Sequence, residues 1–476
     1  MQLRRSVSAV VVFAVLVTSA ACGARLSDEE RALAISAGAP TGQSTDGSAV
    51  ADDGGTVTDG AVTDGSAADG GTATGGDTTG GATTGGDGGG TTGGTAGGTT
   101  GAPAACTPGS ATGIGVTATE IKVGNVSQIS GLVPGFGQTG VNGVKAYFNM
   151  VNSAGGVCGR KLTLVTADDR FQSANNRAET EKLAGQVIAF VGSTTVVDDG
   201  GAPVIDAKGV ADISLTTTAP RTAAKNNFSP NPIDPSPGAG NGAVGILSYF
   251  KRTFGVSKAA IFYQDVATGV NQSKNYEIDF RKAGIPVVAK YPVAPTATNF
   301  RSQATDMKEK GVDIVITVAE VGAISNLARA FKDVGYLPKV PFYGAQTYGR
   351  KFLQQAGDAA NGTRIGLIFS VPEDGGAAIR EFATWYQRTA PGADPDFFAI
   401  LSWVAADLFV DALRAAGPDP SQAKILAHMR TVTSYTGDGL VGGINPAGKA
   451  QPKCFHVLEV KGGKWVKSFP AKGFQC

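Results

Sequence analysis

Strand-length apolar segments alternate with helix-length amphipathic segments along the chain from residue 120 onward. Residues 121–126 form the first apolar segment, and apolar side chains then recur at helical spacing over residues 140–153. Continuous apolar runs separated by helices are typical of parallel strands that are buried on both faces. The alternation therefore predicts an α/β fold with mostly parallel sheets covered by helices.

The alternation occurs in two successive sets. The first set has expected strands at 121–126, 161–165, 187–191 and 211–215, with helices at 140–153, 175–186 and 200–208. After a Pro/Asn-rich stretch, helices are expected at 242–254, 269–283, 299–310 and 321–334, with strands at 259–263, 287–291, 313–318 and 340–343. Later helices at 376–390, 395–416 and 421–431 and strands near 455–461 and 465–469 complete the pattern. Two sets of similar size predict two Rossmann-like lobes.

The N-terminus has the pattern of an export signal. Arg4 and Arg5 precede an apolar run that is too short to span a bilayer comfortably, and small residues follow it. Cys22 comes next and resembles the lipobox cysteine of bacterial lipoproteins, although Ser19 stands where a large aliphatic residue is usual. We expect a signal peptide over residues 1–22, and a lipid-anchored protein at the outer face of the cell membrane or in the periplasm. Cleavage nearby without lipidation is the alternative.

The next segment has an unusual composition. Residues 38–105 are mostly Gly, Thr, Ser, Ala and Asp, with no aromatic residue. Such a segment buries too little apolar surface to offset the entropy of ordering it. We expect a disordered tether over residues 23–117, with a root-mean-square reach on the order of 45 Å for about 65 residues.

The cysteines support export. There are five, and if Cys22 carries lipid, four remain to form two disulfides in an oxidising compartment. Three pairings are possible, of which Cys106–Cys158 and Cys454–Cys476 are favoured. Wide spacing and the lack of nearby histidines argue against zinc. A net charge of +1 gives no indication of a nucleic-acid partner.

Polar residues follow the expected strands, where ligands bind on parallel sheets. Hydroxyl groups follow the third and fourth strands at Ser193, Thr194, Thr195, Thr217 and Thr218. They could donate to a ligand carboxylate, or they could simply cap the helices that follow.

In the second set, Thr268, Glu320 and Gln346 occupy the equivalent strand ends. Glu320 could accept a hydrogen bond from an ammonium or amide, or it could be a helix-start residue favoured by the helix dipole. Tyr263 and Tyr348 could supply aromatic walls, although aromatic residues are more often part of the core.

The loop after the first strand contains a formal G-x-G-x-x-G pattern at Gly135, Gly137 and Gly140. In a dinucleotide site the first glycine follows the strand directly, whereas here about eight residues intervene. The glycines are better explained by a tight turn and a helix start. No signature of a nucleophile elbow, zinc protease or P-loop occurs, and the adjacent pairs Asp168-Asp169 and Asp198-Asp199 read as loop charges. We expect no catalytic residues, no metal and no cofactor. A secreted dinucleotide-binding enzyme is the remaining alternative.

Several segments, taken in order over residues 120–469, resemble one known family. They are Ser130-Gly131, Phe136-Gly137, Asn142-Gly143, Gly155-Gly156, Asp168-Asp169, Phe190-Val191-Gly192-Ser193, Ile213-Ser214, Asp313-Ile314-Val315, Arg329-Ala330, Val334-Gly335 and Gly357-Asp358-Ala359-Ala360. The family is the type I periplasmic binding proteins of the branched-chain amino acid and amide class, which serve ABC importers. The resemblance implies two lobes joined by three crossovers that close on a ligand like a hinge. Lobe 1 would comprise residues 118–243 and 371–436, and lobe 2 residues 244–370 and 437–476.

The resemblance also implies a binding site. It assigns the ligand carboxylate to the hydroxyl and N–H groups of the five lobe 1 residues named above, with Ser130 and the aromatic Phe136 nearby. Lobe 2 departs from the pattern, because Thr268 replaces a common tyrosine and Gln346 replaces an ammonium-binding glutamate. Either Glu320 substitutes, or the ligand is not an α-amino acid.

The implied function is capture of a small polar solute for delivery to an ABC permease with its ATPase subunits. The solute would be a branched-chain or other amino acid, an amide or a small carboxylate. A monomer without enzymatic activity is expected. A receptor of the same fold that feeds a signalling partner is the alternative.

Overall fold

A computed structural model describes residues 106–476, apart from 108, 111, 132–136, 233–235 and 237. Cys22, the expected signal peptide, residues 23–105 of the expected tether and Phe136 lie outside the described residues. Among the described residues, no helix has the length and apolar character needed to cross a membrane.

The first sheet is parallel and has four strands in the order β2-β1-β3-β4. Its strands are β1 (Glu120–Ser127), β2 (Lys161–Asp168), β3 (Ala189–Val191) and β4 (Ala211–Ile213). Helices α2 (Gln138–Ser153), α3 (Ser173–Ala184), α4 (Ala202–Lys208) and α5 (Ala219–Ala223) alternate with them. Because every strand is parallel to its neighbour, all four carboxyl ends lie at one edge of the sheet.

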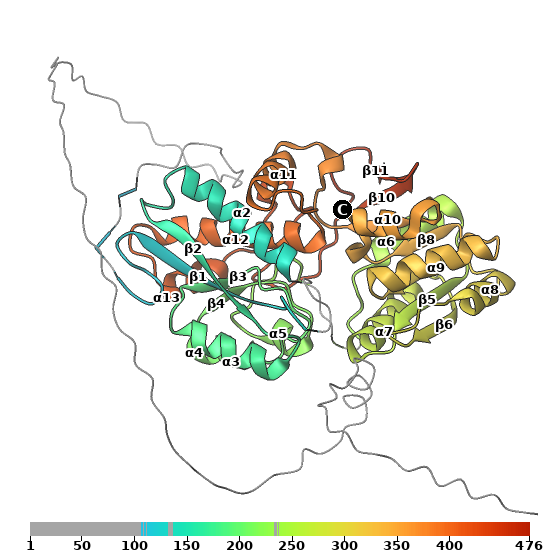
Figure 1. Cartoon of the computed structure of the whole chain (residues 1–476), viewed down its shortest axis with the longest axis horizontal. Coiled ribbons are helices and arrows are strands. Elements are labelled where there is room, and N and C mark those ends of the chain that lie inside the picture. Colours follow the sequence, from blue (N-terminus) through green and yellow to red (C-terminus); the bar gives the residue numbers. More distant parts are fainter. Residues whose placement is uncertain (1–105, 108, 111, 132–136, 233–235, 237) are drawn as a thin grey trace, which may run out of the picture. The chain divides into compact units, whose positions relative to one another are not determined.

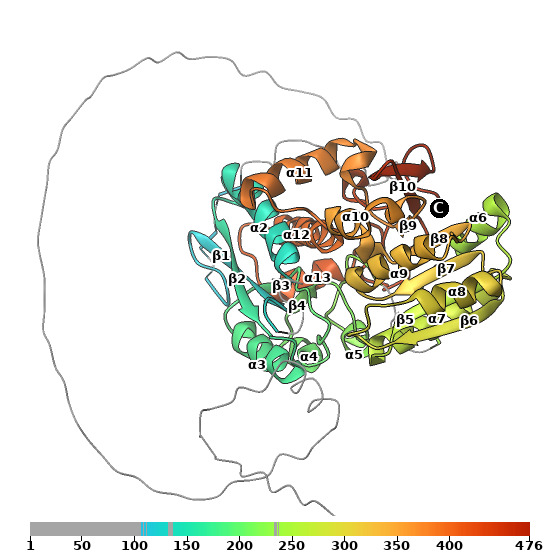
Figure 2. The same cartoon turned by 45° about the vertical axis from the view of Figure 1, so that its right-hand side comes forward.

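Three late helices return to this sheet. They are α11 (Ala377–Thr389), α12 (Phe397–Ala416) and α13 (Gln422–Met429). The long helix α12 is buried along almost its whole length and packs against α2, where Tyr147 and Trp403 meet edge to face with ring centroids 4.8 Å apart. Figures 1 and 2 both show α2 and α12 side by side. The four-stranded sheet and these helices form lobe 1.

The second sheet has seven strands in the order β11-β10-β9-β8-β7-β5-β6. The parallel strands are β5 (Ala259–Gln264), β6 (Val287–Val293), β7 (Ile314–Val318), β8 (Val340–Tyr343) and β9 (Arg364–Leu367). The hairpin of β10 (His456–Lys461) and β11 (Lys464–Phe469) joins antiparallel to β9. With α6 (Val244–Phe254), α7 (Ala267–Lys282), α8 (Arg301–Glu309), α9 (Val321–Asp333) and α10 (Arg350–Ala356), they form lobe 2.

Apolar residues cover both faces of the second sheet. Leu247, Phe250 and Phe280 from α6 and α7 pack in one core cluster with Ile261 of β5. Alternate residues of the same strands belong to a separate cluster with Phe300, Ile324 and Phe331. Burial on both faces explains the continuous apolar runs that the sequence shows.

The expected α/β class with mostly parallel sheets is confirmed. The chain passes between the two sheets three times, between α5 and α6, between β9 and α11, and between α13 and β10, and we call these passages the three crossovers. Two α-helices and one strand were not expected from the sequence: α5, α10 and β9. The lobe boundaries at residues 243, 370 and 436 stay predictions.

Arg160 fixes the start of the folded region. This fully buried residue donates to the carbonyl oxygens of Gly109 at 2.8 Å, Thr117 at 2.8 Å and Pro418 at 2.5 Å. The Cys106–Cys158 disulfide ties down the same segment, and the expected pair Cys454–Cys476 is also formed. The described residues between 106 and 117 therefore belong to lobe 1, whereas the sequence placed the end of the tether at 117.

Candidate functional site

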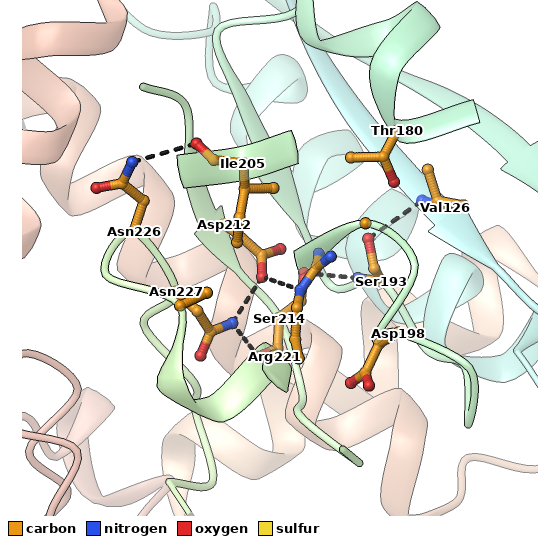
Figure 3. A network of polar contacts seen from close by, with 12 residues as sticks. Val126, Thr180, Ser193, Asp198, Ile205, Asp212, Ser214, Arg221, Asn226 and Asn227 are labelled. Atoms are coloured by element: carbon orange, nitrogen blue, oxygen red, sulfur yellow. Dashed lines mark hydrogen bonds and ion pairs between the residues drawn. The ribbon is translucent and has the colours of Figure 1, made fainter. Parts of the chain in front are cut away.

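Ser193 follows β3 and holds three strand ends together. Its Oγ accepts a hydrogen bond from the backbone N–H of Val126 at 3.1 Å, and its own N–H donates to Ser214 Oγ at 3.0 Å (Figure 3). The residue is only 4% exposed. Ser193 is thus part of the framework beneath the sheet edge.

Thr194 is bound in the same way. Its N–H donates to Ser127 Oγ at 2.9 Å and its Oγ1 donates to the carbonyl of Gly192 at 3.3 Å. A Cβ on Gly140 would lie 2.4 Å from Thr194 Oγ1, and a Cβ on Gly137 would lie 2.7 Å from the Thr194 carbonyl oxygen. These two glycines of the G-x-G-x-x-G pattern therefore let α2 approach the strand end closely, which accounts for them without a dinucleotide.

Thr217 and Thr218 follow β4 and surround a carboxylate of the same chain. The Thr217 N–H donates to Asp198 Oδ2 at 2.7 Å and the Thr218 hydroxyl donates to Asp198 Oδ1 at 2.5 Å. The Thr217 hydroxyl donates to the carbonyl of Thr195 at 3.0 Å. Thr218 occupies the N-cap position of α5, but its side chain makes no capping bond. The alternative of ordinary helix caps therefore does not explain this cluster.

Asp198 was missed at the sequence level, where Asp198-Asp199 was interpreted as loop charge. The interpretation is wrong for Asp198, which is 3% exposed. Burial raises its pKa to about 6, although Arg221 and the hydrogen bonds from Thr218 and Thr217 act in the opposite direction. Its position just after the third strand was the signal that could have identified it.

Arg221 carries a positive charge that offsets part of the negative charge of the Asp198 carboxylate. Its Nε donates to Asp212 Oδ2 at 2.8 Å, and Asn227 Nδ2 donates to the same oxygen at 2.6 Å. Burial alone would lower the pKa of Arg221, but Asp212 and Asp198 outweigh it and raise the pKa. Figure 3 shows Arg221 with Asp212 on one side and Asp198 on the other.

In lobe 2 the candidates lie at the ends of β5, β7 and β8. Gln346 follows β8 and donates from Nε2 to the carbonyl of Ala319 at 2.9 Å, and the Glu320 N–H donates to Gln264 Oε1 at 3.3 Å. The structure therefore brings Gln346 to the start of α9 beside Glu320. Thr268 is half-buried in the first turn of α7.

Glu320 is exposed and stands at the N-cap position of α9 without a side-chain capping bond. Its carboxylate is placed to meet solvent or a solute. The position is equally that of a helix-start residue, so the two sequence-level readings of Glu320 both stay open.

Ser130 is the remaining candidate among the described residues, and it lies in the loop after β1. Ser130 is exposed and donates to Asp168, whose carboxylate also accepts the N–H groups of Ile129 and Arg170. Burial opposes ionisation of Asp168, but these hydrogen bonds outweigh it and lower the pKa. Two surface hollows, at the start of β6 and along α8, contain no candidate residue.

Tyr348 and His456 are buried and hydrogen-bonded within the fold. Tyr348 is buried and donates to Glu373 Oε2 at 2.8 Å, so it is not an exposed aromatic wall. His456 is fully buried, with Nε2 2.7 Å from the carbonyl of Phe369 and Nδ1 3.5 Å from Asp374 Oδ1. Within the described part of the chain, no three His, Cys, Asp or Glu side chains are grouped to hold a metal.

Comparison with known proteins gives a consistent result. Residues 120–464 match the model of a family described as periplasmic binding protein. "Leu/Ile/Val-binding protein homolog 8" of Brucella suis is 22% identical over 340 residues, which cover 66% of this chain and 81% of that protein.

Solved structures show the same fold. A fatty acid ABC transporter substrate-binding protein from Thermomonospora curvata superposes with a TM-score of 0.64 at 19% identity, covering 76% of this chain and 94% of that one. A solute-binding protein from R. palustris in complex with benzoate has a TM-score of 0.59 at 20% identity, covering 75% and 97%.

Proposed function

Since the chain belongs to the periplasmic binding protein family, we propose that it is a receptor that captures one small polar solute between its lobes. Its relatives include Leu/Ile/Val-binding protein homologues and substrate-binding proteins of ABC transporters. The family places it outside the cytoplasm. The solute would be a branched-chain or other amino acid, an amide or a small carboxylate. The captured solute would pass to an ABC permease with its ATPase subunits.

One observation carries the proposal: polar side chains gather at the carboxyl ends of the parallel strands in both sheets. In lobe 1 these are the Thr195, Thr217 and Thr218 groups, and in lobe 2 they are Glu320 and Gln346. Ligands on parallel sheets bind at this edge. Neither group is needed to fill an apolar core, and Glu320 is exposed.

Three further parts of the proposal concern the state of the protein. Cys22 would carry a lipid that anchors the protein to the membrane, the folded region would act as a monomer, and it would catalyse no reaction. Replacing Cys22 with Ser tests the first: the variant should move from the detergent phase to the aqueous phase on partitioning. Retention of the variant in the detergent phase would contradict the lipid anchor.

A thermal-shift screen of amino acids, amides and carboxylates tests the receptor role. A solute that binds only the folded state raises the unfolding midpoint, and calorimetry on each hit should give one solute per chain. Glu320→Gln should change the affinity for a hit, whereas the control Glu309→Gln, on the exposed face of α8, should not. Binding that is equally insensitive to both substitutions would remove Glu320 from the site.

A further inference from the structure

The anion-binding donors at the edge of lobe 1 already have an occupant. Asp198 receives one hydrogen bond at each carboxylate oxygen, from the Thr217 N–H at 2.7 Å and from the Thr218 hydroxyl at 2.5 Å. A carboxylate held by one N–H and one hydroxyl is the arrangement that a bound solute carboxylate would adopt. Here the chain supplies that carboxylate itself.

The other hydroxyl candidates in lobe 1 are also engaged. The Thr217 hydroxyl donates to the Thr195 carbonyl, and Thr195 Oγ1 accepts from the Val197 N–H at 3.3 Å. Ser193 and Thr194 are nearly fully buried and bind β1. A solute carboxylate at this edge would therefore find the half-buried Thr217 and Thr218 hydroxyls already donating, while the hydroxyls of the neighbouring residues lie below the surface.

The local charge also disfavours a second anion. Arg221 is the cation that faces Asp198, and it is shared with Asp212, whose Oδ2 accepts from Arg221 Nε at 2.8 Å. All three side chains are nearly fully buried. Two cations, Arg221 and Lys449, face three carboxylates in this region, those of Asp198, Asp206 and Asp212. The region therefore has excess negative charge when all three are ionised, and a further carboxylate nearby would be repelled at low dielectric.

The groups left at this edge suit a neutral partner. Thr217 and Thr218 are half-buried, and so are the apolar residues Val196, Val197 and Leu215 beside them. Hydroxyl oxygens with free lone pairs can accept from an amide or alcohol, and the apolar residues can contact a short alkyl or aryl group.

We infer that Asp198 is a resident carboxylate that fills the anion-binding donors of lobe 1, so that the solute group facing lobe 1 is a neutral amide or alcohol and not a carboxylate. This inference rests on the proposed receptor function and narrows its range of solutes. Asp198 acts here as a specificity residue, through the donors it occupies.

Rescue by a small anion tests the resident carboxylate without knowledge of the solute. Asp198→Ala leaves the Thr217 N–H and the Thr218 hydroxyl without their acceptor beside Arg221. Sodium formate should then raise the unfolding midpoint of the variant by about 2 °C more than sodium chloride of equal ionic strength does, and should give no such difference in the wild type. An equal formate effect on both proteins would overturn the inference.

Matched pairs of solutes test the specificity. The probes are benzamide against benzoate and isovaleramide against isovalerate, titrated calorimetrically into wild type and Asp198→Asn, which retains the volume of the side chain. The amide of a pair should bind wild type at least about tenfold more tightly than the carboxylate, and the variant should reduce this ratio to about threefold or less.

Tighter binding of the carboxylate to wild type, lost in Asp198→Asn, would show that a solute anion displaces Asp198 and would overturn the inference. Failure of every solute in the broader screen to bind would count against the receptor function, while formate rescue would still decide whether Asp198 fills the donors.

Discussion

Tyr348 donates its hydroxyl to Glu373 Oε2 across 2.8 Å, and this bond fastens the second crossover to lobe 2. The neighbouring Asp374 pairs with Lys467 of β11 at 2.8 Å, close to buried His456. Residues 372–374 are therefore held by side chains from two separate parts of lobe 2. Gly375 follows at a φ of 69°, and α11 of lobe 1 begins at Ala377.

Tyr348→Phe should destabilise the folded region. Burial already raises the pKa of Glu373, and loss of the tyrosine hydroxyl leaves its carboxylate without this donor. We expect the free energy of unfolding to fall by about 1–3 kcal/mol, measured by urea denaturation. Tyr291→Phe is the matched control, because Tyr291 is half-buried whereas Tyr348 is buried, and its loss should be smaller. Equal losses would contradict the structural role of the Tyr348–Glu373 bond.

Ser193→Ala should lower stability even without a solute. The substitution leaves the buried N–H of Val126 without its acceptor, which costs about 1–3 kcal/mol. Thr217→Ala retains its N–H bond to Asp198 and loses the hydroxyl bonds to the Thr195 carbonyl and Asp198, but Thr217 is only half-buried, so its cost should be smaller. Guanidinium denaturation of both variants gives the order, and a greater loss in Thr217→Ala would show that Ser193 is not part of the framework.

Removing each disulfide should cost stability in the order of loop length. Cys106–Cys158 spans 52 residues and Cys454–Cys476 spans 22. The chain-entropy relation gives about 4 kcal/mol for the first and about 3 kcal/mol for the second. Paired Cys→Ser variants, compared by urea denaturation, test the order. A larger loss from the shorter loop would show that contacts around the C-terminal pair matter more than chain entropy.

Stability should fall as pH rises through about 6 because of Asp198. Its folded-state pKa of about 6 lies above the ordinary aspartate value of 3.8, so between these values the folded state binds more protons than the unfolded state. The contribution is therefore favourable at low pH and is lost as Asp198 ionises, by up to about 3 kcal/mol. Arg221, which also pairs with Asp212, faces residue 198 in wild type and in Asp198→Asn alike, so the variant isolates this one group.

Urea denaturation at about pH 4.5 and about pH 7 gives the change in the free energy of unfolding with pH for wild type and for Asp198→Asn. Wild type should lose more stability than Asp198→Asn over this interval. Parallel pH profiles would mean that the Asp198 carboxyl titrates as it does in the unfolded chain.

The sequence predicted those strands whose apolar residues form an unbroken local run. Strands such as β5 and β7 were predicted because their residues are buried on both faces and form unbroken apolar runs. Strand β9 was missed because Arg364 and Gly366 interrupt its run, and it is formed by pairing with β8 and β10. Tertiary pairing of this kind leaves little trace in local composition.

The same limit applies to the candidate site. The positions of Ser193 and Thr217 at strand ends followed from the alternation of strands and helices. Their hydrogen-bond partners could not be predicted in this way, because Val126 and Asp198 come from other parts of the chain. Nothing in the local sequence distinguishes Asp198 from Asp199. The burial of Asp198 is offset by Arg221 from α5 and by hydrogen bonds from Thr217 and Thr218, which come from later in the chain.

Arg160 and the Cys106–Cys158 disulfide determine where a mechanical load would enter the molecule. A pull applied at Cys106 passes into the turn before β2 and, through Arg160, to the carbonyl of Pro418 beyond the end of α12. Both points belong to lobe 1, and neither the disulfide nor the Arg160 hydrogen bond reaches a strand of lobe 2. Tension on the N-terminal side is thus borne by one half of the molecule, which leaves the other half out of the line of force.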